Sequence, residues 1–373
     1  MYFMEIILFI ILLLYVLLLI FVIVGVIRIT QKSLSDDTTR GQKISIVIAV
    51  RNEEDNIEAC LTSLIHQNYD KNNFEIILVD DHSTDSTFHK VEQFIQSTSI
   101  KISVHQLAHK YSKKEALKEG VEKAQYPIIA TTDADCILPT NWLSIISGNL
   151  KRETAMLLGP VVFSNKQGFL GAFQFLDMCA LQGITFGLCY YQHPILNNGA
   201  NLAYFKEDYI RVGGYDGYTT PSGDDVFLLE KFRSNNKEVS GIMNKEFIVV
   251  TRPEDSWQDF INQRLRWASK SIYYKNKLLL FFSSLMLIQN FIIFFIYIGM
   301  LFIEEIRFVG VILIISKWLI DFILLFLLSS FFKQRKKLLY FIPVQLVYPV
   351  YITTVAIASM FYKFKWKGRV FNE

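Results

Sequence analysis

The chain has 373 residues, a formal net charge of +3 and a hydrophobic fraction of 51%, with 31 phenylalanines. This length accommodates two ordinary domains, or one domain and a membrane part, and the charge is too small to indicate a nucleic-acid-binding protein. The four cysteines show no CxxC spacing, which indicates reduced, structural cysteines of a cytosolic domain rather than a zinc site or a disulfide framework.

The first predicted element is an almost continuous apolar run at residues 6–27, long enough to cross a bilayer of about 30 Å. A cleaved signal peptide is the alternative, but no basic segment precedes the run and no small-residue cleavage site follows it. We therefore predict a transmembrane helix within residues 1–30. Because Glu5 precedes the run and basic residues follow it, the positive-inside rule predicts a cytoplasmic middle domain.

The predicted middle domain, residues 41–255, alternates between short apolar strands and amphipathic helices. This rhythm predicts an α/β fold with a mostly parallel central sheet that helices cover on both faces. Strands are expected at residues 44–50, 75–80, 102–107 and 128–132, and helices at residues 55–67 and 113–124. A further helix is expected to begin at Ser83 or Thr84, either of which can cap it.

Acidic residues follow three of the predicted strands, and ligands of parallel sheets bind at the carboxyl ends of strands. These residues are Glu53 and Glu54, Asp80 and Asp81, and Asp133 and Asp135. Two carboxylates one residue apart at the end of a buried strand are costly unless a cation binds them, and a divalent metal carrying a diphosphate is the natural candidate. The first strand-to-helix turn has no GxGxxG, and no Walker A lysine loop occurs, which favours a sugar nucleotide over a hydride cofactor.

The C-terminal third is again apolar, after a predicted amphipathic interface helix at residues 256–277. Within residues 278–362, candidate spans lie at 278–303, 308–332 and 338–362, followed by a basic tail at 363–373. A simple crossing of the last span would put the tail outside, but Pro343 and Pro349 can break it into a re-entrant or interfacial piece, so its topology stays open. Lys317 and Asp321, four residues apart, are expected to neutralise one another, with a functional polar path as the alternative.

Together these segments resemble the family 2 glycosyltransferases, which have a GT-A fold. The resemblance covers roughly residues 44–270 and keeps the order of the family motifs. The matching segments are the opening strand and loop at 45–54, VDDHSTD at 79–85 with His82 in place of the usual glycine, SKKEAL at 112–117 for GKxxAL, DAD at 133–135 for DxD, the acceptor-side segments at 198–201 and 213–216, GDD at 223–225 for the ED motif, and QRLRW at 263–267 for QxxRW.

The resemblance implies a role for each motif residue. Asp135, assisted by Asp133, would hold Mg²⁺ or Mn²⁺ against the diphosphate, and Asp225 would be the catalytic base with Asp224 in support. Lys113 would lie near the phosphates or the base, or else be a solvated lysine at a helix start. The remaining implied site residues are Glu53 and Asp81 for the base and ribose, and Gln263, Arg266 and Trp267 for the diphosphate and the acceptor sugar.

The implied function is a membrane-bound, metal-dependent, inverting glycosyltransferase that transfers a sugar from a nucleotide-sugar, with UDP expected, to a growing polysaccharide or a lipid-linked acceptor. One base and no second carboxylate nucleophile imply a single displacement. The alternatives are a transferase that adds one sugar to a lipid, and a catalytically silent membrane subunit that binds a sugar nucleotide. The expected location is the cell membrane, with several spans and a cytoplasmic catalytic domain.

Overall fold

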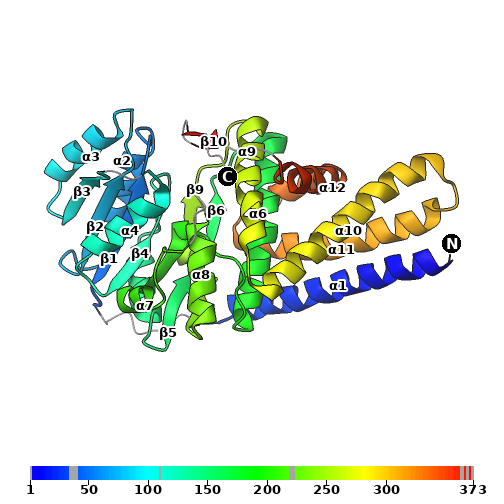
Figure 1. Ribbon diagram of the computed structural model, residues 1–373, viewed down its shortest axis with the longest axis horizontal. Helices are drawn as coiled ribbons and strands as arrows, with labels where there is room; N and C mark the ends of the chain where they lie inside the picture. The colour runs from blue at the N-terminus through cyan, green and yellow to red at the C-terminus, as the bar shows by residue number, and fades with distance from the viewer. Residues whose placement is uncertain are drawn as a thin grey trace.

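The computed structural model describes residues 2–32, 41–108, 111–217 and 223–361, and the backbone of residues 365–366 and 369–370. It consists of a sheet-centred domain and a bundle of long apolar helices that extends from one side of it (Figure 1). The predicted basic tail at 363–373 therefore lies mostly outside the described residues.

The central sheet has seven strands in the order β3-β2-β1-β4-β7-β5-β8. All neighbours are parallel except β7, which runs antiparallel to β4 and to β5. The mostly parallel sheet expected from the sequence is thus confirmed. The strands are β1 (Ile44–Val50), β2 (Phe74–Asp80), β3 (Ile102–Gln106), β4 (Ile128–Thr131), β5 (Thr154–Leu158), β7 (Leu202–Phe205) and β8 (Glu238–Gly241), and a separate parallel pair consists of β6 (Val161–Phe163) and β9 (Val249–Thr251).

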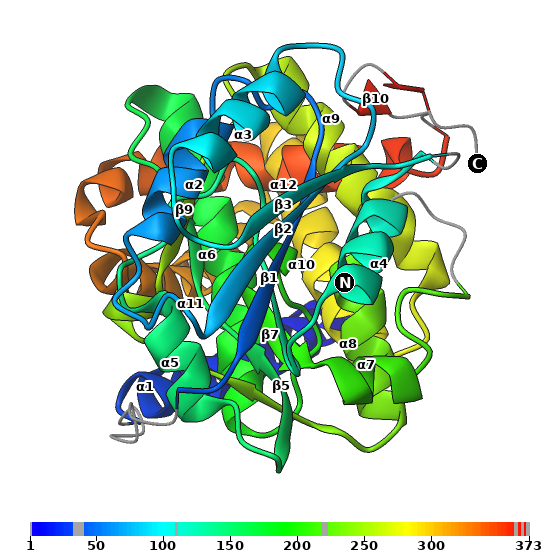
Figure 2. The ribbon, with the colours of Figure 1, turned by 90° about the vertical axis from the view of Figure 1, so that its left-hand side faces the viewer.

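Both faces of the sheet are buried, as its apolar strands require. Ile46 and Ile48 of β1 belong to one hydrophobic cluster, whereas Val47, between them, belongs to the other. Helices α2 (Ile57–Ile65) and α5 (Trp142–Asn149) contribute their apolar residues to the first cluster, and α4 (Lys113–Lys123) contributes to the second. Because β1 pairs in parallel with both β2 and β4, the carboxyl ends of these three strands meet at one edge of the sheet. Figure 2 shows β1 and β2 side by side.

One predicted helix start is wrong. The helix after β2, α3, spans Thr87–Gln96, so its N-cap is Ser86, three residues after Ser83 and two after Thr84. The cause is local competition, because Ser83 donates both its backbone N–H and its hydroxyl to the Asp80 carboxylate. Asp85 instead accepts a hydrogen bond from the backbone N–H of Thr87 at 3.0 Å, at the start of α3.

Three long apolar helices run side by side away from the sheet: α1 (Tyr2–Thr30), α10 (Lys277–Phe302) and α11 (Arg307–Phe331) (Figure 1). By length and composition, each could cross a membrane, and so could the segment Arg335–Ala358 and α6 (Gly168–Tyr190). The segment Arg335–Ala358 consists of η4 (Arg335–Tyr340) and α12 (Phe341–Ala358), and α12 continues through Pro349. The sequence did not predict α6 as a candidate span.

Helix α6 lies between the sheet domain and the bundle (Figure 1). Sixteen of its residues are buried, and it packs against α1, α11 and η4. The other helices at this boundary are α9 (Trp257–Ala268) with the η3 turn (Ser269–Tyr273), and α8 (Asp224–Ser234), whereas the short α7 (Lys206–Arg211) packs against β7. The boundary between sheet and bundle is therefore made by segments that the sequence spreads over residues 168–273.

Candidate active site

Asp133 and Asp135 lie just beyond the end of β4, and a lysine from α4 faces them. Lys113, at the start of α4, forms a 2.5 Å ion pair with Asp133. Asp135 accepts a 2.9 Å hydrogen bond from the Thr251 hydroxyl. Burial, followed by the charges of Asp133 and Glu53, raises the pKa of Asp135 to about 6.

The charge of Asp133 favours the charged form of Lys113, whereas it disfavours the charged form of Asp135. Burial disfavours its ammonium form, but Asp133, Asp224 and Asp225 outweigh that effect and hold the pKa of Lys113 above its usual range. Lys113 therefore stays charged and lies between the acids that follow β4 and the acids that open α8. Its side chain is 25% exposed, so Lys113 lies at the cavity wall, partly accessible to solvent.

Glu53 and Asp81, which follow β1 and β2, are the other acids predicted for the site. Asp81 is 1% exposed, and the guanidinium of Arg51 donates to its backbone carbonyl at 2.5 Å. Glu53 accepts a 2.7 Å hydrogen bond from the Asn56 side chain. Both carboxylates line the same cavity as Asp135.

The Asp224–Asp225 pair opens α8, directly after Gly223, whose φ of +96° lies in the left-handed region. Asp225 accepts hydrogen bonds from the backbone N–H groups of Gly199 at 3.2 Å and of Val226 at 2.8 Å. Burial, followed by the charge of Asp224, raises the pKa of Asp225. A half-buried carboxylate that is more basic than usual is suited to accept a proton.

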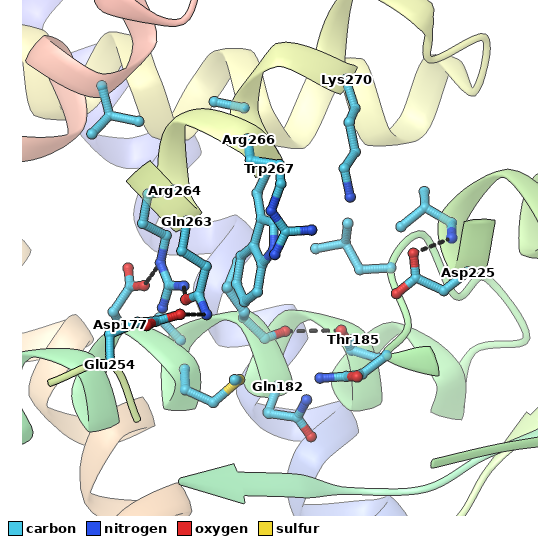
Figure 3. A pocket seen from close by; sticks show the side chains of 18 of the residues that line it. Asp177, Gln182, Thr185, Asp225, Glu254, Gln263, Arg264, Arg266, Trp267 and Lys270 are labelled. Carbon is cyan, nitrogen blue, oxygen red and sulfur yellow. Dashed lines mark hydrogen bonds and ion pairs between the residues drawn. The ribbon is translucent and has the colours of Figure 1, made fainter. Parts of the chain in front are cut away.

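The QRLRW segment lies on α9, whose N-terminus Ser256 caps through a 3.1 Å hydrogen bond from the Asp259 backbone N–H. Gln263, Arg266 and Trp267 all line the cavity (Figure 3). Gln263 donates to Glu254 at 2.7 Å, whereas burial lowers the pKa of Arg266, an effect that Asp224 and other nearby carboxylates partly offset.

All of the predicted site residues line one cavity of about 1750 Å³. They are Glu53, Asp81, Lys113, Asp133, Asp135, Asp224, Asp225, Gln263, Arg266 and Trp267. Asp135 and Asp225 thus open into a common space instead of separate ones. The same cavity continues between the apolar helices, where Phe282, Leu324 and Tyr348 are among its lining residues.

Sequence reasoning missed three charged residues of this cavity. Lys270 is 8% exposed, and its side chain extends toward Asp225 (Figure 3). Burial lowers the pKa of Lys270 to about 8, although Asp225 acts in the opposite direction. The other two are Asp177 and Arg264, which form a buried ion pair at 2.7 Å. The spacing of Lys270, four residues after Arg266 and so on the same helical face, is the only signal that could have revealed it.

The chemistry of the donor set fits a hard divalent cation. Asp133 and Asp135 line the same cavity, and the charge of Asp133 raises the pKa of Asp135, an effect that bound positive charge would relieve. No group of three or more His, Cys, Asp and Glu residues that could hold a metal occurs among the described residues. The two aspartates would therefore hold the ion together with ligand oxygens, as Mg²⁺ sites with one or two carboxylates do.

Residues 45–199 match the family model described as Glycosyl transferase family 2. The chain contains a family 2 glycosyltransferase domain. The matched range includes the acids after β1, β2 and β4, whereas Asp224, Asp225 and the QRLRW segment follow it.

Curated relatives resemble this family 2 domain over short ranges. The chain is 32% identical over 110 residues to glycosyltransferase AglE of Haloferax volcanii, covering 28% of this chain and 36% of the relative. It is 28% identical over 142 residues to the poly-beta-1,6-N-acetyl-D-glucosamine synthase of Staphylococcus aureus, covering 38% of this chain and 34% of the relative. The matches thus span about a third of the length of these relatives.

A solved structure resembles nearly the whole chain. The mannosyltransferase PcManGT from Pyrobaculum calidifontis, in complex with GDP-Man and Mn²⁺, has a TM-score of 0.61 and covers 95% of this chain and 96% of its own. The sequence identity is 16%, so the likeness concerns the fold, which is the GT-A fold of family 2.

Proposed function

We propose that this protein is a membrane-associated, inverting glycosyltransferase that uses a nucleotide-sugar donor and a divalent cation. The observation that carries the proposal is the single cavity lined by the acids after β1, β2 and β4, by Asp224 and Asp225, and by the QRLRW segment. Support for donor and cation also comes from the related fold of PcManGT, which was solved with GDP-Man and Mn²⁺. Here we expect UDP as the nucleotide.

In the proposed reaction, Asp225 accepts the proton of an acceptor hydroxyl while that oxygen attacks the anomeric carbon of the donor sugar. The bond from this carbon to the diphosphate oxygen breaks, and the nucleoside diphosphate leaves. One displacement inverts the anomeric configuration. A divalent cation bound at Asp133 and Asp135 would supply positive charge to the diphosphate.

The remaining residues bind and orient the reactants. Lys113 and Arg266 are cationic groups that line the cavity, where Asp133, Asp224 and Asp225 act on the pKa of both, and where they can donate hydrogen bonds to diphosphate oxygens. Glu53 and Asp81 would accept hydrogen bonds from the nucleoside. The Trp267 indole offers a flat apolar face against which a sugar ring can stack.

The acceptor would approach from the side of the apolar helices, because the cavity continues between them. This supports a saccharide or lipid-linked acceptor held at the membrane. A growing polysaccharide is our first expectation, since one relative is named a poly-beta-1,6-N-acetyl-D-glucosamine synthase. A single addition to a lipid remains the alternative that product size distinguishes.

The test is transfer by the full-length protein in membranes, with a panel of sugar nucleotides, Mn²⁺ or Mg²⁺, and product analysis by mass. We expect UDP release with a sugar-containing product, and a mass ladder if the enzyme is processive. A product that carries only one added sugar would exclude a polysaccharide as the product. If no nucleoside diphosphate is released from any donor, the result would favour the alternative of a catalytically silent subunit that only binds a sugar nucleotide.

Two variants test the residue roles. Asp135→Ala should abolish turnover and weaken calorimetric binding of the metal–nucleotide complex, because the second carboxylate of the pair is lost. Asp225→Asn should retain nucleotide binding but reduce turnover at least about a hundredfold, the typical contribution of a general base. Equal UDP release by wild type and Asp225→Asn would refute the base assignment.

A further inference from the structure

A buried polar network ties the QRLRW helix to two apolar helices. Arg264 Nε donates to Asp177 Oδ2 of α6 at 2.7 Å, and both side chains are 5% exposed. The Tyr348 hydroxyl of α12 donates to the other oxygen of the same carboxylate, Asp177 Oδ1, at 2.9 Å. Asp177 and Tyr348 are 171 residues apart in the sequence, so only the fold brings them together.

The other end of this network is Trp267. The Arg264 guanidinium carbon lies 4.1 Å from the centroid of the Trp267 ring and 4.6 Å from that of Phe260. These distances are well within cation–π range, and the three-residue spacing from Arg264 to Trp267 puts both side chains on one helical face. The guanidinium is therefore fixed by Asp177 and lies against the indole (Figure 3).

Arg264 also contacts the first residue of the motif. It donates to the Gln263 side-chain oxygen, and the Gln263 amide nitrogen donates to Glu254 at 2.7 Å. Two residues of the QxxRW pattern are thus held by the residue between them. Arg264 occupies an x position of QxxRW, yet its side chain contacts the motif residues Gln263 and Trp267.

Stability alone is a weak reason for this arrangement. A buried ion pair loses much of its Coulombic gain to desolvation, and well-packed apolar residues often serve as well or better. A cation–π contact adds directional preference for the indole plane. The geometry thus favours a role in orientation.

We propose that Asp177 and Tyr348 are positioning residues, which set the plane of Trp267 by holding Arg264. The inference rests on the proposed function, in which Trp267 is the stacking surface for the acceptor sugar. It adds that α6 and α12, from the side of the apolar helices, determine where that surface lies. Acceptor binding, and not donor binding, should depend on these two side chains.

The test compares Asp177→Asn and Tyr348→Phe with wild type in the full-length protein. The matched control is Tyr297→Phe, which removes a hydroxyl from the same bundle, where it donates to the Gln345 carbonyl at 3.2 Å. We expect the acceptor KM to rise roughly three- to thirtyfold in Asp177→Asn and less in Tyr348→Phe, in line with the loss of a desolvated cation–π contact. The donor KM and the control should remain at wild-type values.

Fluorescence provides a readout that does not need turnover. The chain has five tryptophans, so the Trp267 emission is obtained as the difference between each protein and its Trp267→Phe counterpart. This difference spectrum should shift in Asp177→Asn and Tyr348→Phe but not in Tyr297→Phe. If Asp177→Asn does not fold, the test relies on Tyr348→Phe, which keeps the ion pair between Arg264 and Asp177.

The failures of the two proposals can be told apart. Absence of sugar transfer by the wild type would reject the proposed function, while the Trp267 emission would still test the positioning. A folded Tyr348→Phe and a folded Asp177→Asn, both with unchanged acceptor KM and unchanged Trp267 emission, would overturn the inference.

Discussion

At the residue scale, the local sequence around each strand identifies the acids of the site but not the cations that face them. Asp133 and Asp135 could be selected from the sequence because two carboxylates at a buried strand end need an explanation. Lys270 could not, because a lysine in an amphipathic helix is ordinarily solvated. Its significance comes from burial beside Asp225, which depends on how α8 and η3 pack.

The charges around Asp225 determine its proton affinity. Burial and Asp224 raise the pKa of Asp225, whereas Lys270 and Lys113 act to lower it. Tyr274, which also lies near Asp225, has a pKa raised mainly by burial and stays neutral at physiological pH. Lys270, whose own pKa is about 8, is protonated at and below neutral pH, where it helps to keep Asp225 ionised.

This balance predicts the pH dependence of turnover. The acid limb reports the ionisation of Asp225, so it should lie above the usual aspartate range. In Lys270→Met the loss of a facing cation should move that limb to higher pH by about one unit, with activity largely regained at alkaline pH. Lys270→Arg should keep the limb near its wild-type position.

The control for this measurement is Lys245→Met, which removes an exposed lysine that is not among the residues lining the cavity. Its pH profile should match that of the wild type. An acid limb that stays in place in Lys270→Met, despite correct folding, would show that Lys270 does not influence Asp225.

At the scale of elements, helix packing against α6 decides how the bundle attaches to the sheet domain. The crossing of α1 and α6 is very close at Gly25 and Gly187. A Cβ atom on Gly25 would lie 2.1 Å from the Gly187 carbonyl oxygen, which is backbone and cannot move aside. Small residues at such a crossing let two helix backbones approach.

Gly25→Ala should therefore destabilise the protein by about 1–3 kcal/mol, through overpacking that forces α1 away from α6. The measurement is the thermal unfolding midpoint of the solubilised protein. Gly299→Ala in α10 is the matched control, because its new Cβ would meet only the flexible end of the Ile306 side chain. An equal loss of stability in both variants would contradict the proposed role of the α1–α6 crossing.

The apolar periodicity of the sequence predicts some helices and strands accurately and others not. The periodicity of apolar residues predicted β1 at the observed residues and predicted the spans at α10 and α11 to within one residue. It placed the start of α3 incorrectly, because the side chain of Ser83 binds Asp80 and not the helix end. It also did not mark α6 as a separate apolar helix, since polar residues such as Gln174 and Asp177 interrupt it and find partners only in the folded chain.

At the scale of the whole molecule, a polar cluster joins the two ends of the chain inside the bundle. Lys317 and Asp321 of α11 form a 2.6 Å ion pair, and the Tyr15 hydroxyl of α1 donates to Asp321 at 2.6 Å. Gln345 of α12 donates to Asp321 at 3.0 Å and accepts from Lys317 at 3.2 Å. The expectation that Lys317 and Asp321 neutralise one another is confirmed, and the cluster connects α1, α11 and α12.

Because both charges are buried, removal of one should cost more than removal of both. Lys317→Met or Asp321→Leu alone should destabilise the bundle by about 3–5 kcal/mol, since each leaves an unpaired charge among apolar helices. The double variant should recover a large part of that loss. A double-mutant cycle, measured by thermal unfolding, gives this coupling energy. Additive losses of unfolding free energy in the two single variants and the double variant would contradict the prediction.

The sequence by itself determined the alternation of strands and helices, the acids at the strand ends and the apolar segments at both ends of the chain. Each of these depends on residues close together in the chain, where side-chain periodicity and local hydrogen bonding act. Only the tertiary structure decided that α6 lies beneath the site, that Lys270 faces Asp225, and that Asp177 and Tyr348 hold Arg264 against Trp267. Those contacts join segments up to 171 residues apart, and their energies depend on burial, which packing of the whole chain creates and no local pattern contains.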